Sequence, residues 1–372
     1  MSHSAKSFLL CIGFALVGCA EQGPIQQALS SESPAIQRVM DNLSQHEVQI
    51  LFTEILRSEE GSSTLLHDEF QVRDGIYHYP ASTVKFPVAL LALEKLGEDD
   101  RLNRYTRFQL QNEDAGTSVT NELTELFVVS DNQAFNRLFE YLGKDEINSR
   151  LDAKEIEARI SHRLSIPDSD VLDTQAISFS SAQGEILVGP ISNQAIEILP
   201  LAELKKGVAY FEEGEKVEEA FDFSEKNYLP LRSLHSVMLR LAFPDQFSES
   251  QQFNLSEADR QFVLNTMQTY PREAGYDELE YPDGYAKFLV LGDSSEQAPG
   301  RFDIYNKSGW AYGYLTDTAY IVDHDNDREF IITASIHVNA NGTFNDDTYE
   351  YDDIGVPFLA ELGRQLVGFE RE

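Results

Sequence analysis

An apolar segment opened by a serine runs from Tyr79 to Leu96 and reads YPASTVKFPVALLALEKL. The apolar run that follows Lys85 predicts a buried helix. Ser82 and Lys85 are three positions apart, and residues at this spacing share one face of a helix. The ammonium group of Lys85 can therefore reach the hydroxyl of Ser82, which makes Ser82 a candidate nucleophile and Lys85 a candidate base.

A serine hydroxyl becomes a useful nucleophile only when a neighbouring group takes its proton. Lysine can do so only if burial and nearby positive charge lower its pKa, and the apolar run favours such burial. Helix capping offers another explanation, because Ser82 follows a proline and precedes an apolar helix, where serine is a preferred cap. Lys85 would then be a solvated first-turn residue. This segment alone does not choose between the two interpretations.

Length and composition predict a globular protein with a sizeable core. The chain has 372 residues, of which 42% are hydrophobic, and this size suits one large domain or two joined ones. Its formal net charge is −34, from 29 Lys and Arg against 63 Asp and Glu. Such a surface repels nucleic acid and anionic headgroups, so we expect no nucleic-acid partner.

The amino terminus is typical of an export signal. Residues 1–19 contain a basic residue, Lys6, then an apolar run too short for an ordinary spanning helix, and then Leu16-Val17-Gly18-Cys19. This last run resembles a bacterial lipoprotein box. The resemblance implies that Cys19 carries the lipid and begins the mature chain, and that the protein faces the periplasm from the outer membrane. An ordinary signal peptide with an incidental Cys19 is the alternative.

The expected mature chain has a tether and one domain. Cys11 lies inside the signal and Cys19 would be blocked by lipid, so disulfides and cysteine catalysis are excluded. Residues 20–33 are polar and predict a tether, and residues 34–372 form the domain. We expect contact with the membrane only through the lipid anchor.

The rest of the chain predicts helices and strands in a mixed order. Periodicity indicates a helix at 34–46, a hairpin at 47–66, helices within 117–143, a β-rich insertion at 176–228, helices at 231–243 and 256–269, strands at 302–310, 315–322 and 329–338, and a final helix at 357–367. This order suits an α+β fold, an α/β sandwich with one antiparallel sheet completed by both ends of the chain.

Three short motifs occur in order along the chain: Ser82-x-x-Lys85, Ser130-Asp131-Asn132 and Lys307-Ser308-Gly309. Each is weak alone, since capping or a polar turn explains it, but chance explains their order poorly. The combination resembles the penicillin-recognising serine hydrolases, and the first spacing is close to that of the class A β-lactamases. The resemblance extends from about residue 34 to residue 366 and does not cover the insertion.

This resemblance implies a β-lactamase/transpeptidase-like fold, in which helices flank the antiparallel sheet and a helical subdomain borders the active site. It also implies the catalytic roles. Ser82 would be the acylated nucleophile, and Lys85 its proton acceptor or electrostatic activator. Ser130 would pass a proton to the leaving nitrogen. The backbone N–H groups of Ser82 and Trp310 would form the oxyanion hole, where donors aimed at the developing charge commonly give the largest stabilisation.

The same resemblance assigns the substrate-binding residues. Asn132 would hydrogen-bond the substrate amide, and Lys307 with Ser308 would hold a substrate carboxylate. Gly309 would keep the strand edge free of a side chain so that the substrate can lie against it.

One departure from the family pattern concerns the base for deacylation. Class A β-lactamases carry a glutamate in an E-x-x-[LI]-N setting after the second motif, and no such stretch occurs between Asp152 and Asp173. Glu155, Asp168 and Asp170 are the nearby carboxylates, and none fits both position and type. We therefore expect acylation of Ser82 and slow hydrolysis of the acyl-enzyme.

The sequence thus predicts a serine acyl hydrolase acting on a β-lactam, a D-Ala-D-Ala peptide or an ester. The rival prediction is a non-catalytic envelope lipoprotein that keeps the fold for binding. Four histidines lack metal-ligand spacing and suit core or surface positions: His162, His235, His324 and His337. We expect a monomer with a small-molecule substrate and neither a metal nor another cofactor.

Overall fold

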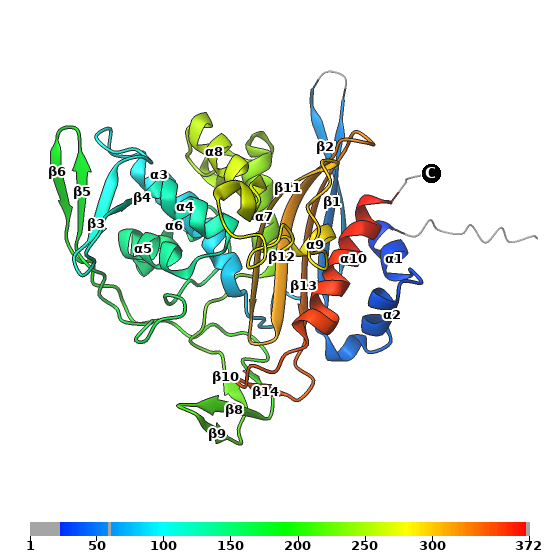
Figure 1. Cartoon of the computed structure of the whole chain (residues 1–372). Coiled ribbons are helices and arrows are strands. Elements are labelled where there is room, and N and C mark those ends of the chain that lie inside the picture. The colour runs from blue at the N-terminus through cyan, green and yellow to red at the C-terminus, as the bar shows by residue number, and fades with distance from the viewer. Residues whose placement is uncertain (1–22, 59–60, 370–372) are drawn as a thin grey trace, which may run out of the picture.

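The computed structural model describes residues 23–58 and 61–369, and its centre is a five-stranded antiparallel sheet (Figure 1). The strand order is β11-β12-β13-β1-β2. The bounds are β1 Gln49–Arg57, β2 Ser63–Phe70, β11 Phe302–Ala311, β12 Tyr314–Asp323 and β13 Arg328–His337. Because β1 pairs with β13, the prediction of a single sheet completed by both ends of the chain is confirmed.

Helices cover both faces of this sheet. Helices α1 (Pro24–Leu29), α2 (Pro34–Met40) and α10 (Val356–Val367) lie against one face and share an apolar core with it (Figure 1). Helices α7 (Leu231–Ala242) and α8 (Glu257–Gln268) lie on the other face. Beyond them is the helical region with α3 (Lys85–Leu96), α4 (Val119–Val128), α5 (Asn132–Leu142) and α6 (Lys144–Ala153). The fold class expected from the sequence is confirmed.

The first described helix lies within the segment that was expected to be a tether. Residues 24–29 form α1, and its side chains Ile25, Ala28 and Leu29 are buried in the core shared with α10. Residues 20–33 are polar as a whole, so the sequence analysis did not predict that these three apolar side chains form part of the core. The signal segment and Cys19 lie outside the described residues. Among residues 23–58 and 61–369, no helix is both long enough and apolar enough to cross a membrane.

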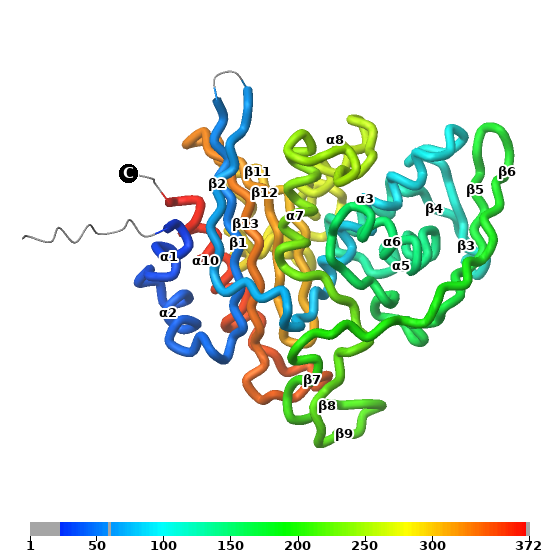
Figure 2. Tube along the Cα trace, turned by 180° about the vertical axis from the view of Figure 1, so that it is seen from behind, coloured from blue at the N-terminus to red at the C-terminus, as the bar shows by residue number. Residues whose placement is uncertain are grey.

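The expected β-rich insertion at 176–228 divides into two parts. Strands β5 (Ile177–Ser181) and β6 (Gly184–Val188) join β3 (Arg107–Leu110) and β4 (Thr117–Ser118) in a sheet at the edge of the helical region. The remaining strands, β7 (Lys205–Lys206), β8 (Ala209–Glu212), β9 (Glu215–Val217) and β10 (Phe221–Asp222), form a small lobe at one end of the central sheet (Figure 2). The insertion is therefore not one separate unit.

Aromatic packing and a partly buried ion pair attach this lobe to the sheet. Phe221 and Phe223 stack against Tyr312 and Phe344, and β14 (Thr343–Phe344) pairs with β8. The ammonium of Lys206 lies 2.8 Å from the carboxylate of Glu47, which precedes β1. The lobe thus borders the turn between β11 and β12.

Candidate active site

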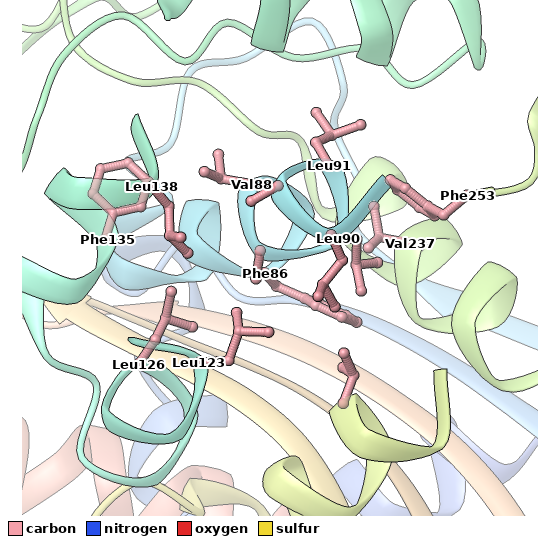
Figure 3. Packing of buried hydrophobic residues seen from close by; sticks show 14 of the residues in the cluster. Phe86, Val88, Leu90, Leu91, Leu123, Leu126, Phe135, Leu138, Val237 and Phe253 are labelled. Atoms are coloured by element: carbon pink, nitrogen blue, oxygen red, sulfur yellow. The ribbon is translucent and has the colours of Figure 1, made fainter. Parts of the chain in front are cut away.

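Ser82 lies at the junction between a short 3₁₀ turn and a buried helix. The turn covers Ala81–Val84 and leads directly into α3, whose apolar side chains pack against α4, α5 and α7 (Figure 3). Ala81 has a φ of +49°, a strained conformation for a residue with a Cβ atom. The helix is fixed on all sides by core packing, so the position of Ser82 is fixed with it.

The structure removes the capping explanation for the serines of the first two motifs. The N-cap position before the turn is Pro80, so Ser82 does not cap a helix. Asp131 caps α5, because its carboxylate accepts a hydrogen bond of 2.7 Å from the backbone N–H of Ala134. Ser130 lies between α4 and α5 with a φ of +58°. Both serines are therefore free for chemistry.

The three motifs meet at the hydroxyl of Ser130. The Nζ atom of Lys85 lies 3.2 Å from Ser130 Oγ and also donates to the Ser130 carbonyl. The Nζ atom of Lys307 donates to Ser130 Oγ at 2.8 Å. Within the described chain, the Ser82 hydroxyl has no hydrogen-bond partner, so Lys85 bonds Ser130 and not Ser82 in this state. A side-chain rotation at Ser82 or Lys85 is needed for the proton transfer predicted between them.

Lys85 and Lys307 are both buried, and burial lowers the pKa of each ammonium group. Burial lowers the pKa of Lys85 well below its usual range, and the positive charge of Lys307 lowers it further. Burial also lowers the pKa of Lys307 to about 7, opposed by the charge of Asp317. A lysine with a depressed pKa can be neutral near physiological pH and accept a proton. The site therefore supplies the kind of base that a serine nucleophile requires.

Gly309 is needed for a reason that differs from the sequence prediction. A Cβ atom at Gly309 would lie 2.5 Å from the backbone nitrogen of Ser82 and 2.9 Å from that of Thr83. The missing side chain therefore lets the turn that carries Ser82 lie against the strand edge. This contact brings the backbone of Ser82 to the edge of β11.

The backbone N–H of Trp310 points away from the sheet at the same edge. Strands β11 and β12 are joined by a two-residue turn, Tyr312-Gly313, in which both residues have positive φ. The pair Ala311–Tyr314 closes this turn with hydrogen bonds, and hydrogen-bonded pairs alternate along an antiparallel ladder. The next pair, Trp310–Leu315, therefore leaves the Trp310 N–H unpaired. Because β11 is an edge strand, this donor faces outward at the edge where Gly309 meets the backbone of Ser82, and its oxyanion-hole role stays a prediction.

Ser308 does not reach the site. Its side chain is fully buried, and its hydroxyl donates to the carbonyl of Ala286 at 2.8 Å. Side chains alternate along a strand, so Ser308 points to the face opposite Lys307. The neighbouring carboxyl of Asp317 is buried on that face too, and burial raises its pKa to about 6. The structure therefore gives Ser308 a place in the core and not among the substrate-binding residues.

A cavity of about 520 Å³ opens beside Ser82. Its walls come from the end of β11, the start of α5, the loop after α6 and the insertion, and they include Tyr79, Ser82, Asn132, His162, Arg163, Leu164, Ser165, Lys226, Trp310 and Tyr312. The amide of Asn132 is directed to this loop, since its Nδ2 donates to Ser165 Oγ at 2.9 Å. The sequence analysis did not predict the lining residues from the loop and the insertion, because only folding brings them to Ser82.

The loop after α6 contributes Leu164 to the cavity wall. Asn136 holds Leu164 through two hydrogen bonds, one of 3.0 Å to its carbonyl and one of 2.8 Å from its N–H. No carboxylate is among the residues that line the cavity in the described chain. Glu155, Asp168 and Asp170 are exposed and lie outside it, and Glu155 accepts a hydrogen bond from Gln251 instead.

His162 lines the cavity but both of its ring nitrogens are engaged. Nδ1 pairs with the carbonyl of Arg163 at 2.5 Å, and Nε2 accepts from the N–H of Asn227 at 3.3 Å. Burial lowers the pKa of His162 to about 4, so the ring is neutral and its acceptor is occupied. His235 is buried like His162, His337 is partly buried, and His324 is exposed, as expected for core and surface histidines. In the part of the chain that the structure describes, no group of three His, Cys, Asp or Glu could hold a metal ion.

The five-stranded antiparallel sheet with its flanking helices and helical region is the β-lactamase fold. Residues 33–187 match the sequence profile of the beta-lactamase enzyme family. Solved β-lactamases have the same fold over 90% of this chain. They include proteins from Burkholderia ambifaria (13% identity, 99% of that chain, TM-score 0.50), Xanthomonas campestris pv. campestris (14%, 97%, 0.51) and Desulfarculus baarsii (13%, 98%, 0.51). A comparison with curated protein sequences finds no match.

Proposed function

We propose that this protein is a serine acyl hydrolase, related to class A β-lactamases, that forms an acyl-enzyme on Ser82 from a β-lactam or a related cell-wall amide or ester. The observation that supports this proposal is the position of Ser130 Oγ. It lies 3.2 Å from the ammonium group of Lys85 and 2.8 Å from that of Lys307, beside the cavity that Ser82 lines.

In the proposed acylation, Ser82, Lys85, Ser130 and Lys307 each have a defined role. Neutral Lys85 takes the proton of Ser82 as Ser82 Oγ bonds to the substrate carbonyl carbon. The backbone N–H groups of Ser82 and Trp310 stabilise the oxyanion that develops. Ser130 gives its proton to the leaving nitrogen as the carbon–nitrogen bond breaks, and Lys85 returns a proton to Ser130. The positive charge of Lys307 favours the Ser130 oxygen during this transfer.

Asn132 has a supporting role in this proposal. Its Nδ2 donor is held at the cavity wall by Ser165, within the same loop that carries Leu164. A substrate amide that enters the cavity exchanges with Ser165 for this donor. The Asn132 side chain would thereby orient the acyl group for attack by Ser82.

Hydrolysis of the acyl-enzyme is the slow step in this proposal. A deacylating water needs a positioned general base, and no carboxylate lines the cavity among the described residues. A penicillin-binding esterase or D-Ala-D-Ala carboxypeptidase is the alternative within the same chemistry. The lack of a carboxylate in the cavity wall of the described chain favours these alternatives over a fast β-lactamase, since hydrolysis is left to water that no side chain activates.

Labelling with a penicillin tests the proposal directly. Intact mass and peptide mapping after exposure to a labelled penicillin should find one adduct on Ser82 in the wild type and none in Ser82→Ala. Ser165→Ala is the matched control, because it removes a hydroxyl from the same cavity and should still be labelled. A wild type that resists penicillin, fluorophosphonate and activated esters alike would support the non-catalytic binding protein instead.

We further propose that the chain is a lipoprotein of the bacterial envelope that is anchored through Cys19. The support is the sequence Leu16-Val17-Gly18-Cys19 after an apolar run. Fractionation of Cys19→Ser should find soluble protein or an unprocessed precursor, whereas the wild type should sediment with membranes. Mature wild-type protein that is soluble with a free amino terminus would contradict the anchor.

A further inference from the structure

Two side chains that carry a charge at neutral pH line the cavity beside Ser82, and one of them is fully used by the protein itself. Arg163 donates to the carboxylate of Glu140 at 2.5 Å and to the carbonyls of Val171 and Asp173 at 2.8 and 3.1 Å. Its guanidinium group therefore holds the loop after α6 against α5. It has no donor directed at a ligand.

Lys226 is the other cation, and it comes from the insertion. No ion pair or hydrogen bond engages its ammonium group within the described chain, and the nearest aromatic ring is that of Phe221, with its centroid 5.9 Å away. Burial lowers the pKa of Lys226, and the charges of Asp170 and Glu225 oppose this effect. A half-buried ammonium group has thus lost part of its hydration and gained no fixed partner in return.

The residues expected to hold a substrate carboxylate are engaged elsewhere. Lys307 is only 1% exposed, and its ammonium donates to Ser130 Oγ and to the carbonyl of Ser308 at 2.6 Å. Ser308 is bonded to Ala286 on the other side of the strand. Neither residue lines the cavity. An anion that enters this cavity finds its free cationic partner in Lys226.

We propose that Lys226 binds an anionic group on the acyl part of the substrate and so determines specificity. This inference rests on the proposed acylation of Ser82. The leaving nitrogen must face Ser130, and Ser130, Lys85 and Lys307 are not among the residues that line the cavity. The part of the substrate that lies between Ser82 and Lys226 is therefore the part that stays on the enzyme.

A second cavity limits how far such an anion can extend. It has a volume of about 470 Å³ and shares His162, Ser169 and Lys226 with the first. Its walls carry four carboxylates, from Asp170, Glu212, Asp222 and Glu225. These charges repel an anion that passes Lys226. The anion is therefore bound on the side of Lys226 that faces Ser82.

Matched substrates on one chromogenic cephalosporin nucleus test this proposal. The side chains are phenylacetyl, which is neutral, and phenylmalonyl and glutaryl, which each add one carboxylate at a different distance. The measured quantity is the acylation rate constant at low substrate concentration, expressed as the ratio of each anionic substrate to the neutral one. Loss of a charge-assisted contact should reduce this ratio about 10- to 100-fold in Lys226→Met for at least one anionic side chain.

Two variants control this measurement. Lys226→Arg keeps the charge and should retain the preference. Lys216→Met removes a lysine of the same lobe that lies outside both cavities and pairs with Glu218 at 2.9 Å, and it should leave the ratio unchanged. An equal ratio in the wild type and Lys226→Met for both anionic side chains would overturn the role of Lys226.

Binding without chemistry separates this proposal from acylation. Calorimetry with Ser82→Ala should find tighter binding of an anionic substrate than of the neutral one, and Lys226→Met in that background should abolish the difference. If the wild type is not acylated but this difference is present, the anion site stands and the proposed reaction fails. If acylation occurs and the difference is absent, the reaction stands and the anion site is wrong.

Discussion

Lys307 donates a hydrogen bond of 2.8 Å to the hydroxyl of Ser130, a residue 177 positions earlier in the chain. This bond connects the edge strand of the sheet to the helical region. Because Lys85 approaches the same hydroxyl from α3, one oxygen atom joins all three motifs. The arrangement makes Ser130 the residue through which protons can move between nucleophile and leaving group.

Removal of the Ser130 hydroxyl should slow acylation while leaving Ser82 in place. We expect Ser130→Ala to reduce the acylation rate constant by about 10²- to 10⁴-fold, the usual contribution of a positioned proton donor. Stopped-flow measurement with a chromogenic cephalosporin gives this rate. Ser165→Ala should change it by less than Ser130→Ala does, since Ser165 contacts Asn132 and neither lysine. Equal effects of the two variants would contradict a proton-transfer role for Ser130.

If deacylation is slow, we expect a burst of product in the first turnover. Mixing the wild type with a chromogenic cephalosporin should release about one equivalent of product quickly, followed by a much slower steady state. The reason is that a missing general base costs about 10²–10⁴ in the rate of the step it serves. A fast steady state without a burst would mean that a base acts after all. Single amide substitutions of Glu155, Asp168 and Asp170 would then identify it or leave Lys85 to serve both steps.

The pH dependence of acylation should have two limbs. Lys85 must be neutral, so the rate rises with pH through a pKa that burial and Lys307 hold well below the usual lysine value. Lys307 must be charged, so the rate falls as pH rises through its pKa of about 7. Lys307→Gln removes a positive charge near Lys85 and should therefore shift the acid limb to higher pH. An acid limb that stays in place in this variant would exclude coupling between the two lysines.

Gly309→Ala should impair the site through the backbone. The added Cβ atom would lie 2.5 Å from the Ser82 nitrogen, closer than real contacts allow, so either β11 or the nucleophile turn must shift. We expect a fall in acylation of at least about 10²-fold, as for loss of an oxyanion-hole donor. Gly300→Ala is the matched control, because a Cβ atom there meets nothing within 4 Å. Acylation rates and melting temperatures of both variants would check this expectation.

The partly buried ion pair between Lys206 and Glu47 should contribute to stability. Lys206→Met leaves the Glu47 carboxylate, which is 22% exposed, without its closest cation, and we expect a loss of about 1–3 kcal/mol. Lys205→Met is the control, because Lys205 is mostly exposed and lies 3.5 Å from its partner Asp222. Denaturant unfolding at neutral pH measures both. A loss below about 1 kcal/mol in Lys206→Met would show that the pair is only a surface contact.

The same pair predicts how stability changes in acid. Burial raises the pKa of Glu47, but the charges of Lys206 and His337 outweigh this effect, and the net pKa lies below the usual value of 4.5. A carboxyl group with a lowered folded-state pKa stabilises the protein above its unfolded pKa. This contribution is therefore present above about pH 4.5 and is lost as the pH falls through the folded value. In Lys206→Met the acid-dependent part should shrink.

Local sequence patterns predicted most helices and strands. The roles of several residues near Ser82 could not be predicted, because they depend on contacts that form only in the folded chain. The final helix, expected at 357–367, is α10 at Val356–Val367, because its apolar spacing is regular and its packing is local. The role of Gly309 could not be predicted, since it depends on a contact with Ser82 across the fold. The buried orientation of Ser308 was missed for a related reason. A polar residue in a motif suggests exposure, whereas strand alternation places it in the core.

The insertion was the least predictable part of the chain. Its strands are short, and their partners β3 and β14 lie far away in the sequence. Lys226 carries no local signal either, because its position at the cavity depends on the attachment of the whole lobe to the end of the sheet. Lys85, Ser130 and Lys307, in contrast, were singled out residue by residue, and the structure brings both lysines to the Ser130 hydroxyl.

The pairing of β1 with β13 limits when the central sheet can be completed during synthesis. Gln49 lies opposite Ser335. Strand β1 can therefore pair with β13 only after about nine-tenths of the chain has been synthesised. Contacts between distant parts of a chain form slowly. A nascent chain with its amino-terminal strands made and β13 still missing has an open sheet edge and no assembled site, since Lys307 also arrives late. The contact between Lys307 and Ser130 can therefore form only after most of the chain has been synthesised.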